Sequence, residues 1–183
     1  MLHFPPIPGW DGLHPLIIHF PIALLLMAPI LVVVGAMLSP AKGRPYLIAA
    51  LILLLAGTAS IYVAVQTGEA AGKLAERSPG IESILENHEF LAERTQAVFS
   101  VLSVIFVALI AVPWLLQRAD TRLATTILPL AFLVLYSAGA LLLVNTAHNG
   151  GRLVHEFGVR AMVSPTPVGT EAALPIETDR DKD

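Results

Sequence analysis

Six histidines are the residues through which this chain could bind a metal ion or a redox cofactor. Neutral imidazole is a ligand for haem iron, copper and zinc. The sequence holds no cysteine, which excludes disulfides, thiolate metal sites, iron–sulfur clusters and covalently attached c-type haem. Any redox or metal chemistry therefore falls to the histidines, which are His3, His14, His19, His88, His148 and His155.

The composition places these histidines in a membrane protein. Of the 183 residues, 55% are hydrophobic and only 14% are charged, against about 25% charged residues in a typical soluble domain. The mean hydropathy is +0.73 and the pI is about 6.0. With a net charge of −3, the chain has no basic field for nucleic acid. We therefore expect the lipid bilayer to be a partner, and nucleic acid not to be one.

Four apolar runs are long enough to cross a hydrocarbon core of roughly 30 Å as helices. The predicted fold is an all-α bundle of four transmembrane helices, with the third and fourth helices extended on the outer side. Ser78 and Pro79 are typical of a helix start and begin the third helix well before its apolar run. The predicted helices span about 16–38, 46–66, 79–116 and 123–157. They form one domain over 1–161, which a flexible tail over 162–183 follows.

The connecting loops predict the orientation of the bundle, because cytoplasmic loops carry an excess of Lys and Arg. The loops at 39–45 and 117–122 are both basic, whereas the loop at 66–96 is dominated by glutamate. The N-terminal segment before the first helix has no Lys or Arg. Both termini and the 66–96 loop are therefore predicted to lie outside, in the periplasm or its equivalent. All six histidines then fall on the outer side.

Helix geometry arranges the histidines in two tiers at this outer end. At about 1.5 Å per residue, His88 lies roughly 13 Å above the membrane entry of the third helix. His148 and His155 share one face of the fourth helix, with His155 the higher. We therefore expect His88 to lie level with His155. His148 then lies near the level of His14 or His19. Two facing histidines per tier is what a b-type haem with two imidazole ligands requires.

Two features near these histidines bear on the ligand set. Gly150 and Gly151 either end the fourth helix or let a flat macrocycle approach the backbone. His14 stands at a helix start, where it either caps the helix or replaces His19 as a ligand. The candidate haem-iron ligands are His19, His148, His88 and His155, and the further cofactor-binding candidates are His14, Gly150 and Gly151.

Two motifs enclose most of the chain. The opening motif is His14-Pro15-Leu16-Ile17-Ile18-His19-Phe20-Pro21, and the closing motif is His148-Asn149-Gly150-Gly151-Arg152-Leu153-Val154-His155. Together with His88 before Leu91-Ala92, they resemble the domain-of-unknown-function family 2231 of bacterial membrane proteins over residues 12–161. Many relatives have Tyr-x-His-Gly after the Gly-Gly-x-Leu-Val core, so a ligand role for His155 rests on the variant with histidine there.

This resemblance implies a four-helix domain of the kind found beside or fused to cytochrome c-like domains, and hence respiratory electron transfer. The predicted function is a subunit of the bacterial inner membrane that holds one or two b-type haems. It would pass electrons between a quinone pool or partner dehydrogenase and a periplasmic acceptor such as a c-type cytochrome. We do not expect an enzyme by itself, because the chain has no nucleophile–base–orienter set.

Two other functions stay open at this point. One is a non-catalytic scaffold or assembly subunit of a larger complex, whose histidines serve only in hydrogen bonds. The other is a histidine-based metal-handling membrane protein. The sequence also leaves open whether a quinone binds and whether the chain forms a homo-oligomer.

Overall fold

The structure is a computed structural model that describes residues 7–75 and 78–159. Every regular element among these residues is helical, which confirms the predicted all-α fold. The short elements are the 3-10 helix η1 (Trp10–Gly12), the α-helix α1 (His14–Ile17) and the π-helix η2 (Leu123–Ile127). The long α-helices are α2 (His19–Met37), α3 (Pro40–Gly72), α4 (Pro79–Leu115) and α5 (Leu128–His155).

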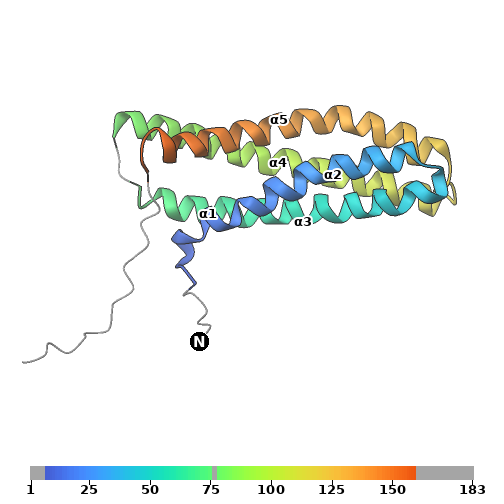
Figure 1. The fold of residues 1–183 in the computed structure, drawn as a ribbon, viewed down its shortest axis with the longest axis horizontal. Coiled ribbons are helices and arrows are strands. Elements are labelled where there is room, and N and C mark those ends of the chain that lie inside the picture. The colour runs from blue at the N-terminus through green and yellow to red at the C-terminus, as the bar shows by residue number, and fades with distance from the viewer. Residues whose placement is uncertain (1–6, 76–77, 160–183) are drawn as a thin grey trace, which may run out of the picture.

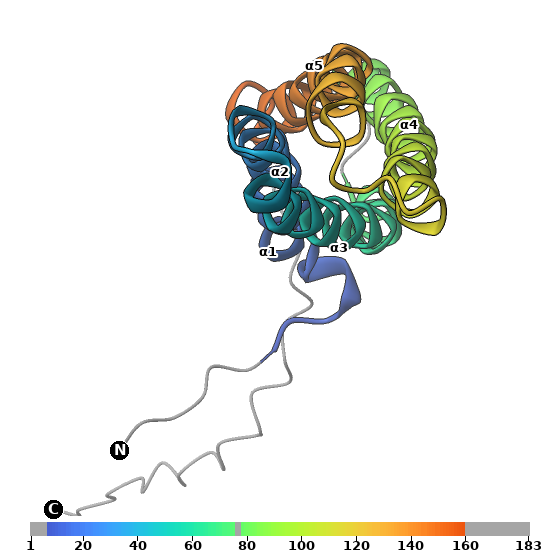
Figure 2. The ribbon, with the colours of Figure 1, turned by 90° about the vertical axis from the view of Figure 1, so that its right-hand side faces the viewer.

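The four long helices run alternately up and down and lie around a ring. Helix α2 contacts α3, α3 contacts α4, α4 contacts α5, and α5 closes the ring on α2 (Figure 1, Figure 2). Apolar side chains such as Val104 and Val134 are 69% and 72% exposed on the outside of this ring, as a surface against lipid requires. The segments long and apolar enough to cross a bilayer are His14–Met37, Pro40–Gly72, Pro79–Leu115 and Leu123–His155. The protein is therefore a multi-pass membrane protein with four candidate spans.

The first two helices differ from their predicted bounds, the second at both ends, because α3 continues beyond 66 to Gly72. Proline explains the differences at the start of α3 and within the first span. Helix α3 begins at Pro40, not at 46, since proline is well suited to a first helical position, where its missing N–H leaves no bond unmade. The first span is divided at Ile18 between α1 and α2. Pro21 explains this division, because it has no N–H to bond the carbonyl of Ile17. The predicted tail over 162–183 lies outside the described residues.

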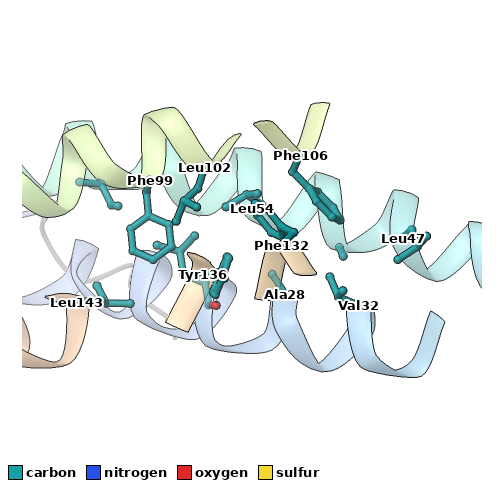
Figure 3. Close-up of a cluster of buried hydrophobic side chains, with 13 residues drawn as sticks. Ala28, Val32, Leu47, Leu54, Phe99, Leu102, Phe106, Phe132, Tyr136 and Leu143 are labelled. Carbon is teal, nitrogen blue, oxygen red and sulfur yellow. The ribbon is translucent and has the colours of Figure 1, made fainter. Parts of the chain in front are cut away.

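The interior of the bundle is mainly apolar, with a buried hydrogen bond of 2.9 Å between Thr58 on α3 and Ser103 on α4. Four aromatic rings form a line along the interior (Figure 3). Phe99 lies edge-on to Tyr136 with 5.5 Å between ring centroids, and Phe106 stacks on Phe132 at 4.7 Å. The Tyr136 hydroxyl donates a hydrogen bond to the carbonyl of Leu25, on α2. Because this buried hydroxyl has a partner, it adds no unpaired polar group to the core. The rings therefore tie α4, α5 and α2 together.

The two ends of the bundle differ in chemistry. At the histidine end, α1 begins, α3 ends, α4 begins and α5 ends (Figure 1). At the opposite end, called here the loop end, α2 leads into α3 and α4 leads into η2. Tyr46 and Trp114 are 40% and 60% exposed near the loop end, as aromatic side chains at a membrane interface commonly are.

Candidate cofactor site

Two imidazoles from different helices meet inside the histidine end. His14, at the start of α1, and His88, on α4, are both half-buried. Their ring centroids lie 6.5 Å apart and their planes are inclined at 77°. The site thus brings together two residues that the spans His14–Met37 and Pro40–Gly72 separate along the chain.

Each ring is fixed by a hydrogen bond from its Nδ1 to a backbone carbonyl. His14 Nδ1 lies 2.9 Å from the carbonyl oxygen of Ala64 on α3, and His88 Nδ1 lies 3.0 Å from that of Thr146 on α5. A carbonyl only accepts, so in each ring Nδ1 carries the hydrogen. In neutral imidazole Nε2 then keeps its lone pair. Histidines that bind metals are commonly oriented in this way.

Two glycines make room for the rings. A Cβ atom added to Gly68 on α3 would lie 2.9 Å from Cε1 of His14, and one added to Gly150 on α5 would lie 2.9 Å from Cε1 of His88. Real Cβ atoms essentially never come so close to another atom. Any larger residue at either position would therefore displace an imidazole.

The same local arrangement occurs twice in the bundle. On α3, the accepting carbonyl of Ala64 precedes Gly68 by one helical turn, and on α5 that of Thr146 precedes Gly150 by the same spacing. Residues four apart lie on one face of a helix, so the carbonyl and the glycine together face the ring. The hairpin of α1 to α3 and the hairpin of α4 and α5 each hold one imidazole in this way.

A threonine hydroxyl contacts the His14 ring, and two threonine hydroxyls join α4 to α5 near the His88 ring. Thr67 is 0% exposed, and its hydroxyl donates to backbone carbonyls of its own helix. Its lone pairs are then free to accept from His14 Nδ1, at 3.3 Å, as a second partner beside Ala64. Near His88, the hydroxyls of Thr95 and Thr146 are 2.8 Å apart and join α4 to α5. The two imidazoles therefore differ in one respect, because His14 alone has a hydroxyl as a second acceptor among the contacts of the described residues.

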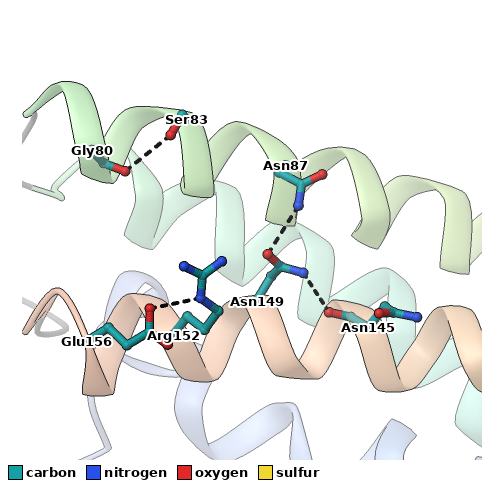
Figure 4. A network of polar contacts seen from close by, with 7 residues as sticks. All are labelled: Gly80, Ser83, Asn87, Asn145, Asn149, Arg152 and Glu156. Atoms are coloured by element: carbon teal, nitrogen blue, oxygen red, sulfur yellow. Dashed lines mark hydrogen bonds and ion pairs between the residues drawn. The ribbon is translucent and has the colours of Figure 1, made fainter.

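An asparagine bridge fixes α4 against α5 beside His88. Asn87 Nδ2 donates to Asn149 Oδ1 at 3.1 Å, and Asn149 Nδ2 donates to the carbonyl of Asn145 at 2.9 Å (Figure 4). Further along α5, Arg152 pairs with Glu156 at 2.8 Å in a more exposed position. Because Asn87 directly precedes His88, the bridge limits sliding of α4 against α5 at this histidine.

The other predicted ligands do not join this pair. The side chains of His19, His148 and His155 are exposed. The expected tiers were His88 with His155 and His148 with His14 or His19, whereas in the described residues the ring beside His88 is that of His14. The cause is the break before α2, which lets the short α1 carry His14 inward against α3. His3 lies outside the described residues.

The two glycines of the closing motif have different surroundings. Helix α5 continues through both of them to His155, so they do not end it. Gly150 lies against the His88 ring, whereas a Cβ on Gly151 would have no atom within 4 Å. Within 7–75 and 78–159, no group of three or more His, Cys, Asp or Glu side chains could hold a metal ion.

Several residues of the site escaped the sequence reasoning. Ala64, Thr67 and Gly68 on α3 and Thr146 on α5 hold the rings, and none has a side chain that suggests a ligand. The sequence does contain one signal for them. Near the end of the second helix of each hairpin, a small residue precedes a glycine by four positions, as Ala64 precedes Gly68 and Thr146 precedes Gly150.

Comparison with known proteins gives a family and nothing finer. The family model described as "Predicted membrane protein (DUF2231)" matches residues 11–162. The searches of curated proteins and of solved structures found no match.

Proposed function

The chain belongs to the DUF2231 family of predicted membrane proteins, and we propose that it holds one b-type haem between His14 and His88. In this proposal it is an electron-transfer subunit of a membrane redox complex. The observation that carries the proposal is the pair of adjacent imidazoles, inclined at 77°, each with Nδ1 bonded to a carbonyl.

The donor set fits haem b. His14 and His88 would hold the haem iron through their imidazoles, since histidine is a common haem-iron ligand. The centroids of His14 and His88 are 6.5 Å apart. When bound, the haem iron would take up and release one electron.

The residues around the pair would hold and tune the ligands. The carbonyls of Ala64 and Thr146 fix each ring and make its Nε2 more basic. Thr67 adds a second acceptor to His14 alone. Below the pair, Phe99 and the other rings of the core keep water from the bundle interior. Strong donors and a dry interior are the means by which a protein sets a haem potential.

The proposed location is the bacterial inner membrane, with the histidine end in the periplasm. Basic residues at the loop end, such as Lys42 and Arg118, support this orientation. Exposed glutamates on the first turns of α4, such as Glu86, belong to the other end. Electrons would pass between a quinone pool or partner dehydrogenase and a periplasmic acceptor such as a c-type cytochrome. The resemblance to domains found beside cytochrome c-like domains supports these partners.

A non-catalytic scaffold is the second candidate function. Both imidazoles already have hydrogen-bond partners and glycines that fit them, so the pair could serve only to join the two hairpins. A zinc-handling role fits the site less well, because zinc takes three or four protein ligands and the site brings together two imidazoles.

Haem content distinguishes these functions. We expect the protein purified from haem-sufficient cells to show a reduced low-spin b-type spectrum. His14→Ala and His88→Ala should each abolish haem binding, measured as pyridine haemochrome. His19→Ala and His148→Ala are matched controls, since these side chains are exposed near the same end, and both should retain full occupancy. Haem-free wild-type protein would support the scaffold, and loss confined to the two controls would contradict the ligand pair.

A further inference from the structure

A groove at the loop end lies far from the histidine pair. It has a volume of about 520 Å³ and lies between the first turns of α3 and the connection from α4 to η2. Its lining residues are Ala41, Arg44, Pro45, Ile48 and Asp120. One wall is therefore apolar, and the groove contains one cationic and one anionic side chain.

The two charged side chains of the groove are not used by the protein itself. Arg44 is half-buried and Asp120 is exposed. Neither side chain has a hydrogen bond or ion pair, with the other or with any other described residue. Arg44 is thus a partly desolvated cation without a counter-ion, which is costly unless a ligand supplies one.

The groove opens at the level of lipid headgroups. Arg44 precedes the interfacial Tyr46 by two positions on α3. From the groove, the exposed side chains of Ile48, Ile52 and Leu55 follow one face of α3 towards the middle of the span. A lipid with its headgroup in the groove would therefore have an apolar surface for its acyl chain.

We propose that this groove binds a phospholipid whose headgroup carries both a phosphate and a primary ammonium. The Arg44 guanidinium would donate to the phosphate oxygens, and the Asp120 carboxylate would accept from the ammonium. A choline headgroup offers Asp120 no N–H donor. A headgroup that carries a phosphate and no ammonium leaves the Asp120 carboxylate without a partner. The negative charges of the phosphate and the carboxylate then repel each other.

Lipid retention tests the proposal. Wild-type protein is delipidated and offered equal amounts of phosphatidylethanolamine, phosphatidylglycerol and phosphatidylcholine with the same acyl chains, and the bound lipid is measured by native mass spectrometry. We expect phosphatidylethanolamine to be preferred. Arg44→Gln should lower its retention about tenfold, as loss of a charge-assisted hydrogen bond does. Asp120→Asn should move the preference towards phosphatidylglycerol.

Lys42→Gln is the matched control, because Lys42 is an exposed cation on the same turns of α3 that does not line the groove. It should leave retention unchanged. Equal retention of the three lipids, or equal loss in Arg44→Gln and Lys42→Gln, would overturn the proposal. Soluble phosphoethanolamine is added as a competitor; displacement of the lipid at equimolar concentration would show a site for the free headgroup and contradict a lipid site. None of these outcomes depends on haem.

Discussion

Substitution of Gly150 by Ala tests the packing of His88 against α5. The new Cβ would lie 2.9 Å from His88 Cε1, whereas ordinary contacts begin at 3.4 Å, so the ring must move by about 0.5 Å. That movement strains the bond from Nδ1 to the Thr146 carbonyl, now 3.0 Å long. Overpacking of a tight site typically costs about 1–3 kcal/mol. Loss of the hydrogen bond adds about 1 kcal/mol, and the gain in helix propensity returns up to about 1 kcal/mol.

The adjacent Gly151 provides a matched control on the same helix. Its added Cβ meets nothing within 4 Å, so Gly151→Ala keeps only the propensity gain and should stabilise the fold by up to about 1 kcal/mol. We expect Gly150→Ala to destabilise it by about 1–3 kcal/mol. Reversible unfolding in mixed detergent micelles measures both.

A double-mutant cycle shows whether the imidazole causes the loss. In a His88→Ala background the clash disappears, so Gly150→Ala should become stabilising, with a coupling energy of about 2 kcal/mol. Equal effects of Gly150→Ala with and without the His88 ring would refute the packing described here.

Three further predictions concern Thr67, Tyr136 and the orientation of the chain in the membrane. Thr67→Val removes the second acceptor of His14 Nδ1. Because His14 then becomes a weaker donor to iron, the reduction potential of the proposed haem should rise by tens of millivolts in a redox titration. An unchanged potential would contradict this role of Thr67. Tyr136→Phe removes the buried bond to the Leu25 carbonyl and should lower the free energy of unfolding by about 1 kcal/mol; full stability of the variant would show that the bond contributes nothing. Reporter fusions at Lys42 and at the C-terminus should report opposite sides of the membrane, whereas identical signals would rule out the proposed orientation.

The fold could be predicted because membrane spans depend on simple physical limits. An apolar run must be helical and about 20 residues long to cross lipid, and the four runs met this condition. Ser78-Pro79 correctly marked the start of α4. The start of α3 at Pro40 was missed. The six residues from Pro40 to 45 are helical, but they precede the apolar run from which the prediction was made.

The pairing of the histidines could not be predicted from heights along straight helices. Those heights placed His14 just outside a first helix that begins at about 16, whereas the structure places it on the separate short helix α1, where its ring bonds to α3. Helical rotation was a second unknown, because it decides that His148 is exposed while its neighbour Asn149 is buried. The acceptor at Ala64 is a backbone carbonyl. Every residue has such a carbonyl, so the residue type does not indicate which one will bind an imidazole.

The electron paramagnetic resonance spectrum of the oxidised protein tests the central claim most directly. Two imidazole ligands give low-spin ferric haem, and ring planes inclined at 77° should give a strongly anisotropic signal with one large g value. The signal should disappear in both His14→Ala and His88→Ala. A high-spin ferric signal from the wild-type protein, or a low-spin signal that survives both substitutions, would contradict the ligation of haem by His14 and His88.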